Sequence, residues 1–352
     1  MNEKRTYRFY TLVLAGLLSS ALMFVYAVNV LVDPLWHFSG SKIINTSFRF
    51  DERNMKVNYF NDNPENYNCM IFGASRTVLL DESLLEEHNC FNMAFVLGHV
   101  REFVMVAECV KQRGFTPDRV IVGVDEVSFE DRAYTDGENL PAYVLTHERP
   151  KWSIEDYLGK TAFSFSIDTI RRTAPKFIIY RRRDDRTFKG TLQWHGKTYD
   201  PDQHEVLTQR FFQPFDREMF HEFVKLREVF PDTEFVGYVP PVSDWRSARM
   251  ELTGNLESYI DLRYRLSALF DGGFWDFSVP NETTADKSLT QDGAHYIEPV
   301  NVEIANCLNG QIDFCGVDVH ALTFEQYRNL IVTPVRERIS RENLSATLAD
   351  EG

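Results

Sequence analysis

The chain has 352 residues, the length of one large domain or of one domain with a small addition. Hydrophobic residues make up 43% and charged residues 26%, proportions that exclude a disordered or fibrous chain. Lys and Arg number 38 against 52 for Asp and Glu, so the formal charge is −14. A nucleic-acid partner is excluded on this balance, because phosphate binding needs a basic face. The mean hydropathy of −0.32 excludes a polytopic membrane protein but not a single span.

The first element is an uncharged apolar run from Phe9 to Val32. About 20 apolar residues cross a bilayer, so the run is long enough to span one. Lys4, Arg5 and Arg8 precede it, and the positive-inside tendency then keeps the N-terminus in the cytoplasm. The alternative is a cleaved signal peptide, whose apolar region is usually about 7–15 residues. Because the run continues past Ser19, Ser20 and Ala21, we favour an uncleaved single-pass anchor.

Beyond the anchor, short apolar runs alternate with helical patterns, which predicts a doubly wound, mainly parallel α/β sheet. The five predicted strands are 70–73, 91–94, 120–124, 235–239 and 274–277. The predicted helices are 101–113, 217–230, 256–270 and 299–308, with an amphipathic stretch at 324–339. The predicted organisation is a cytoplasmic N-terminus (1–8), an anchor (9–32), a polar connector or flap (33–66), the sheet domain (67–315) and a C-terminal helical tail (316–352).

The third and fourth strands are much further apart than one crossover needs. We interpret residues 130–213 as an insertion that lies over the carboxyl ends of the strands, where open α/β sheets bind ligands. Its arginine run, 181–186, is either a contact for an anionic substrate or a solvated face. Its aromatic stretch, 194–199, either stacks on sugar rings or belongs to the core, and the same choice applies to Trp245.

The five cysteines include no CxxC pair and no Cys/His cluster with zinc spacing, so no metal site is predicted. Cys69 and Cys90 each precede a strand-like run and could meet at one edge of two neighbouring parallel strands. Cys307 and Cys315 flank a turn at Asn309-Gly310. Both pairs are candidate disulfides in an oxidising compartment, with Cys109 left over on a helix face. Five reduced, buried cysteines are the alternative.

Ser75 is the first candidate for chemistry. It lies in Gly73-Ala74-Ser75-Arg76-Thr77, directly after the first strand and before a helical pattern. A serine at the carboxyl end of a parallel strand is well placed as a nucleophile, because nearby backbone amides can stabilise an oxyanion. The α/β-hydrolase elbow G-x-S-x-G does not match, since Thr77 replaces the second glycine.

The second candidate is Asp292-Gly293-Ala294-His295, in a loop after the last predicted strand. An aspartate three residues before a histidine can orient the imidazole, and the imidazole can take a proton from a serine. In a parallel sheet, the loops after the first and last strands converge on one edge. The three residues Ser75, Asp292 and His295 therefore form a predicted triad.

An early strand-Gly-x-Ser followed by a late D-x-x-H resembles the SGNH (GDSL-like) hydrolase superfamily. The likeness is greatest to its membrane-anchored bacterial cell-envelope branch, which includes the alginate O-acetylation proteins and the D-alanyl transfer protein of teichoic acid synthesis. It covers residues 67–129 and 235–308. The resemblance implies Ser75 as nucleophile, His295 as general base and Asp292 as its orienting partner, with the amides of Ser75 and Gly98 in the oxyanion hole.

Two positions depart from the family pattern. Ala74 replaces the aspartate of the usual Gly-Asp-Ser block, and the third block has Asp125 and Glu126 where the family supplies an asparagine. A carboxylate there repels an oxyanion unless it is protonated or paired. Arg76 is a candidate partner for Asp125, or a contact for an anionic group on the substrate. For His99, packing or capping is favoured over a catalytic role.

The resemblance implies a single-pass protein of the bacterial inner membrane with its body in the periplasm or outside the cell. Its expected activity is that of a serine esterase or O-acyltransferase, most simply for acetyl, on a cell-envelope or exported polysaccharide. Expected partners are that polysaccharide or its acylated precursor, and a multi-span membrane protein that delivers the acyl group. No cofactor is expected. The alternative is a non-catalytic binding or scaffold protein of an envelope assembly complex.

Overall fold

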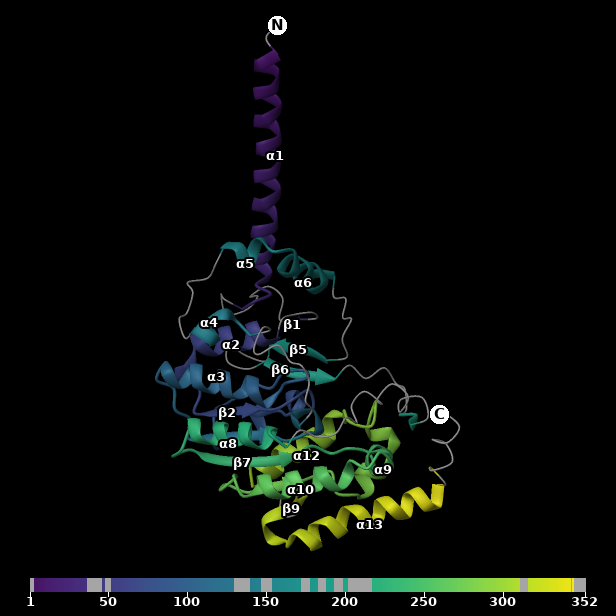
Figure 1. The fold of residues 1–352 in the computed structure, drawn as a ribbon. Coiled ribbons are helices and arrows are strands. Elements are labelled where there is room, and N and C mark those ends of the chain that lie inside the picture. The colour runs from purple at the N-terminus through teal and green to yellow at the C-terminus, as the bar shows by residue number, and fades with distance from the viewer. Residues whose placement is uncertain are drawn as a thin grey trace.

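The computed structural model describes residues 3–36, 46–47, 52–129, 140–146, 154–171, 178–182, 188–192, 199–201, 217–310, 316–342 and 344. Its centre is a mixed, mostly parallel six-stranded sheet (Figure 1). In the order in which they pair, the strands are β3 (Cys90–Asn92), β2 (Cys69–Phe72), β4 (Arg119–Gly123), β7 (Glu234–Val239), β8 (Phe274–Asp276) and β9 (Val317–Asp318). All neighbours are parallel except β8 and β9.

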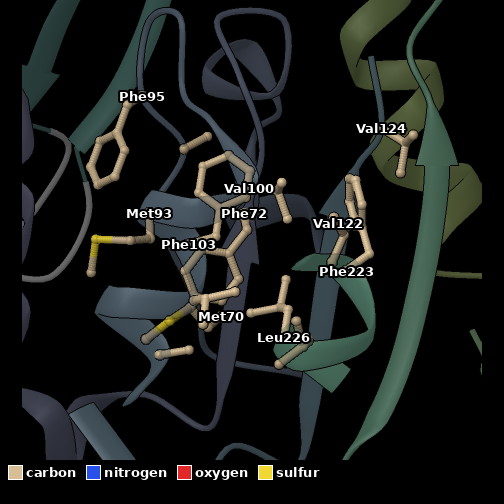
Figure 2. Close-up of a cluster of buried hydrophobic side chains, with 14 of the residues drawn as sticks. Met70, Phe72, Met93, Phe95, Val100, Phe103, Val122, Val124, Phe223 and Leu226 are labelled. Carbon is tan, nitrogen blue, oxygen red and sulfur yellow. The ribbon is translucent and has the colours of Figure 1, made fainter. Parts of the chain in front are cut away.

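Side chains alternate between the two faces of the sheet, and both faces are buried. Met70 and Phe72 of β2 point into the larger core, whereas Cys69 and Ile71 point into the smaller one. In Figure 2 the larger core brings β2 and β4 together with α3 (Val100–Gln112) and α8 (Met219–Val229). The smaller core is covered by α12 (Glu298–Leu308). Burial on both faces explains why β2 is apolar throughout rather than alternating.

The predicted strands and helices are confirmed to within a few residues. Helix α3 begins at His99, whose Nδ1 accepts a hydrogen bond from the Arg101 amide, so this histidine is a cap, as favoured above. Helix α10 spans Leu256–Ser267, and α9 (Asp244–Leu252) follows β7 where the sequence had shown only Pro240-Pro241. The short helices α4 (Ala142–Thr146) and α11 (Glu282–Ala285) complete the body.

Two regions differ from the sequence expectation. The polar connector contains a helix, α2 (Glu52–Asp62), whose Met55, Val57, Tyr59 and Phe60 are all buried in the larger core. The tail supplies the sixth strand, β9, and the helix α13 (Phe324–Glu342), whose Tyr327 and Ile331 enter the same core. Residues 316–342 therefore pack as part of the sheet domain rather than as an appendage.

Besides α4 and residues 199–201, the described parts of the insertion form two groups. Helices α5 (Ile154–Leu158) and α6 (Lys160–Arg171) pack on the end of α1 (Glu3–Val32). Strands β5 (Ile178–Arg182) and β6 (Phe188–Leu192) pair with each other, and β5 pairs with β1 (Thr46–Ser47), in a small antiparallel sheet. Strand β6 contacts the 3₁₀ turn η2 (Thr77–Leu79) directly after Ser75. This strand of the insertion therefore lies at the carboxyl edge of the main sheet.

Helix α1 is long and apolar enough to span a membrane over Thr6–Val32. At its end, the Asn29 side chain donates to the Tyr157 carbonyl over 2.7 Å, and the Tyr157 hydroxyl donates to Asp33. Trp36, just beyond, is buried against Tyr59 of α2. The helix is therefore fixed to the body by buried polar and aromatic contacts.

Cys69 and Cys90 occupy paired positions at the start of β2 and β3 and form a disulfide. Cys307 on α12 is also disulfide-bonded, while its predicted partner, Cys315, lies outside the described residues. Cys109 is free and buried on α3. Disulfides form and persist in oxidising compartments.

Candidate active site

Ser75 lies at the carboxyl end of β2, where the chain order of the sheet switches sides. From β2 the chain passes to β3 on one side and then crosses to β4 on the other, and ligands of open α/β sheets bind at such a switch point. Two glycines allow the close packing here. A Cβ at Gly73 would lie 2.2 Å from the Thr77 Oγ1, and one at Gly123 only 1.9 Å from it. Thr77 thus fills the space between the ends of β2 and β4.

The helical pattern expected after Ser75 takes the form of two short 3₁₀ turns, η2 and η3 (Glu82–Leu84). The first turn is closed by the Thr77 and Val78 amides, which both donate to the Ala74 carbonyl. The Ser75 amide donates to no group in the described residues. It is therefore available to a bound oxyanion.

Three predicted residues form one hydrogen-bonded chain. The Ser75 Oγ lies 2.8 Å from Nε2 of His295, and Nδ1 of the same ring lies 2.7 Å from Oδ2 of Asp292. The other Asp292 oxygen, Oδ1, accepts hydrogen bonds from the amides of Ala294 and His295. With Nδ1–H donating to Asp292, Nε2 is the basic nitrogen and faces the serine hydroxyl.

The loop that carries Asp292 and His295 is closed tightly at its base. Thr290 and Tyr296 form an isolated antiparallel bridge, and the Thr290 hydroxyl donates to the His295 carbonyl over 3.1 Å. Gly293 has a φ of 81°, and a Cβ there would lie 2.7–2.8 Å from Tyr199 and Ser243. Tyr199, one of the insertion's aromatic residues, is therefore buried against this loop instead of being exposed to a sugar ring.

The charge state of Asp292 suits its predicted role as the residue that orients His295. Burial alone would raise the pKa of its carboxyl, but the nearby His295 charge and the hydrogen bonds from His295 outweigh burial and hold that pKa well below its ordinary range. The carboxylate therefore stays ionised across the physiological pH range. An ionised Asp292 can stabilise the imidazolium that forms when His295 takes a proton.

A second, buried set of charges lies beside the serine. Arg76 forms an ion pair with Glu126 and lies 3.5 Å from Oδ2 of Asp125. Arg246 of α9 pairs with the other side of Glu126 at 2.8 Å. The charges of two arginines and two carboxylates thus lie together in this set. Asp125, which would repel an oxyanion if it were unpaired, therefore has Arg76 as a partner. Since Arg76 is buried and paired, it is a partner for these carboxylates rather than a surface contact for an anionic substrate.

The two carboxylates are not equivalent. Burial would raise the pKa of Glu126, but Arg76 and Arg246 lower it to about 2. For Asp125 burial prevails over Arg76, and Glu126 adds to it, so the pKa of Asp125 is raised. Glu126 therefore stays ionised to lower pH, and Asp125 is the member of the set that gains a proton more easily.

The predicted oxyanion donor Gly98 is placed differently from expectation. Its amide donates to the Phe95 carbonyl over 2.9 Å and so closes a turn. A Cβ at this position would lie 2.7 Å from the Gly73 carbonyl oxygen, which keeps the residue a glycine. Leu97, just before it, has a left-handed φ of 55°, a conformation that costs a non-glycine residue about 1–2 kcal/mol. In this geometry the Gly98 amide is engaged in a turn, whereas the Ser75 amide has no acceptor among the described residues.

Helix α2 holds this strained loop. Glu52 accepts a hydrogen bond from the Val96 amide at 2.6 Å, and the Lys56 ammonium donates to the Ala94 carbonyl at 2.5 Å. Arg53 pairs with Glu102 of α3, whose carboxylate also accepts from the His99 amide. No pattern in the sequence predicts these contacts, because the charges of 52–56 are those expected of a solvated connector.

Other sequence candidates either fall outside the described residues or lie elsewhere in the fold. Trp194 and residues 183–186 of the arginine run lie outside the described residues. Trp245 lies between Arg338 and Lys287 and donates to Glu342, so it covers α13. Over the described ranges, no group of three or more His, Cys, Asp or Glu side chains could hold a metal ion.

Comparison with known proteins identifies no family. No family model and no curated protein matches the chain. Two chains among the solved structures match, and one is described as a platelet activating factor from Streptococcus pneumonia. It is 8% identical, with a TM-score of 0.35, over 73% of this chain and 91% of that chain. A similarity this weak carries no argument about function, so the function must be argued from the site.

Proposed function

We propose that this protein is a membrane-anchored SGNH-like serine esterase or O-acyltransferase that works through an acyl-serine intermediate. The observation that carries the proposal is the continuous hydrogen-bonded chain from Asp292 through His295 to Ser75. The order of the five parallel strands also supports it. Counted along the chain they run 2-1-3-4-5, the order of flavodoxin-like sheets.

The proposed reaction has two halves. The Ser75 Oγ attacks the acyl carbonyl carbon while its proton passes to Nε2 of His295, and the Ser75 amide donates to the oxyanion. When the tetrahedral intermediate collapses, the bond to the donor's oxygen breaks, and that oxygen leaves with the proton from His295. An acceptor hydroxyl, from a sugar or from water, then gives its proton to His295 and attacks the acyl-serine. Ser75 regains the proton as it leaves.

The substrate class follows from the resemblance and from the anchor. A body fixed beside a membrane, with at least one disulfide, suits an envelope or exported polysaccharide whose acyl groups arrive through a multi-span membrane partner. Water as acceptor gives an esterase and a sugar hydroxyl gives a transferase. Both use the same three residues.

A fluorophosphonate probe tests the nucleophile directly. We expect the full-length protein to label covalently, Ser75→Ala to lose labelling, and His295→Ala to label far more slowly. Ser288→Ala is the matched control, because this serine is exposed and its hydroxyl donates to Asp286. Labelling that persists in Ser75→Ala would contradict the proposal. If labelling fits, acetyl analysis of surface polymers in a Ser75→Ala strain identifies the substrate.

A non-catalytic scaffold is the second candidate, because the Gly98 amide is already used by Phe95 and two carboxylates occupy the third block. In that case a folded, exported protein would neither label nor hydrolyse an acetyl ester, and Ser75→Ala would leave surface polymers unchanged.

A further inference from the structure

Large exposed apolar side chains lie on the two helices that pack on the anchor, α5 and α6. Outside α1, the described residues include four: Leu145 (46% exposed), Ile154 (57%), Ile170 (49%) and Leu330 (42%). The first three lie on α4, α5 and α6, whereas Leu330 lies on α13. In Figure 1, α5 and α6 lie across the axis of α1 at the point where it enters the body, while α13 is at the opposite end.

Helix α6 is packed with its small side chains inward. The buried positions are Ala162, Ser166 and Thr169, spaced i, i+4, i+7. The adjacent stripe at the same spacing consists of Phe163, Ile167 and Ile170, which are half-buried or exposed. A helix facing water normally buries its large apolar stripe. Its two ends carry the exposed basic residues Lys160 and Arg171.

The length of α1 indicates that α5 and α6 lie at the headgroup region of the bilayer. The part of α1 with no protein around it, Thr6 to Phe24, is about 28 Å long at 1.5 Å per residue. The hydrocarbon core of a bilayer is about 30 Å thick. The next two turns, from Val25 to Val32, are partly covered by the body, and α5 and α6 are the helices that pack on this end. If Thr6–Phe24 fills the core, α5 and α6 lie at the lipid headgroups.

We propose that α5 and α6 form a membrane-contacting platform, with the Phe163-Ile167-Ile170 stripe and Ile154 inserted into the outer interface of the bilayer that α1 spans. An apolar stripe flanked by basic residues is what an interfacial helix presents to lipid. The contact fixes the height and tilt of the body, because Tyr157 of α5 is hydrogen-bonded to Asn29 and Asp33 at the end of α1, and α6 packs on the same end. The inference rests on the membrane span and is independent of any catalytic role for Ser75.

The test uses the full chain in lipid vesicles without any other protein. Single cysteines at Ile170 and Ile154 are labelled under non-reducing conditions with an environment-sensitive fluorophore, and vesicles with and without brominated acyl chains are compared. Leu14→Cys on α1 is the positive control and Leu330→Cys on α13 the negative one. The unsubstituted protein, with Cys109 buried, gives the labelling background.

We expect brominated lipid to quench the probes at 14, 154 and 170, with quenching at 170 several-fold stronger than at 330. Quenching at 14 without quenching at 154 or 170 would overturn the platform and would point to a protein partner on this face. Absence of quenching at 14 would overturn the span on which it rests. Because Ser75→Ala should not change any of these results, a failed platform and a failed enzyme assignment are distinguishable.

Discussion

The Ser75 Oγ and the His295 Nε2 lie 2.8 Å apart although 220 positions separate them along the chain. The sheet makes this contact, since the turn after β2 and the loop before α12 meet at its carboxyl edge. The contact is oriented from the far side of the ring by Asp292. Removing the charge of Asp292 while keeping its shape separates orientation from mere packing.

We predict that Asp292→Asn lowers the rate of fluorophosphonate labelling by roughly 10⁴-fold, the loss seen when a triad aspartate becomes an amide. The reason is the tautomer: the amide NH₂ would donate to Nδ1, so the ring proton moves to Nε2, which can no longer accept from Ser75. Labelling kinetics at fixed pH measure the effect. Asp286→Asn, an exposed cap of the neighbouring turn, should label at the wild-type rate. Equal losses in both variants would exclude the orienting role.

The strands and the hydrogen-bonded residues Ser75, His295 and Asp292 can be predicted from the sequence for a physical reason. Because the parallel strands are buried on both faces, their centres are short apolar runs, as in Val120-Ile121-Val122. Positions at the carboxyl ends of such strands converge whatever the intervening loops do. This convergence places Ser75 and His295 together without any knowledge of side-chain contacts.

The missed elements lack such a pattern. In α2, Met55, Val57, Tyr59 and Phe60 point in different directions around the helix, so no single apolar face marks it. Strand β9 has only two residues, too few for any periodicity. The pairing of Arg76 with Glu126 depends on side-chain geometry across two strands, which no spacing along the chain reveals.

The buried charge set next to Ser75 makes a stability prediction. Replacing Glu126 by Gln leaves Arg76 and Arg246 without their shared anion in a buried site, which typically costs 3–5 kcal/mol. Urea unfolding at pH 7 measures the loss. Glu257→Gln is the control, because its pairs with Arg328 and Arg336 are partly exposed and are worth about 1 kcal/mol or less.

The same variant tests how the free energy of unfolding depends on pH in the acidic range. The pKa of Glu126 is lowered from 4.5 to about 2, so its stabilising charge is fully present above pH 4.5 and is lost as the pH falls toward 2. The difference in unfolding free energy between wild type and Glu126→Gln should therefore shrink over this window. A difference that is constant from pH 5 to pH 3 would show that the Glu126 charge is not what stabilises the wild type.

Lys56 predicts a second pH dependence of stability, at alkaline pH. Burial lowers the pKa of its ammonium from 10.5 to about 8, although Glu52 and Glu82 oppose the shift. Between pH 8 and 10.5 the unfolded chain then binds the additional proton, so raising the pH favours the folded state. Wild-type protein should gain stability over this window relative to Lys56→Met.

Lys225→Met, at an exposed position on α8, should show no such difference. The Lys56 hydrogen bond also holds the Ala94 carbonyl in the loop that ends at Gly98. Lys56→Met should therefore slow labelling of Ser75 as well, while Lys225→Met leaves it unchanged. If Lys56→Met labels at the wild-type rate while keeping its altered alkaline slope, α2 stabilises the fold without positioning the loop beside the serine.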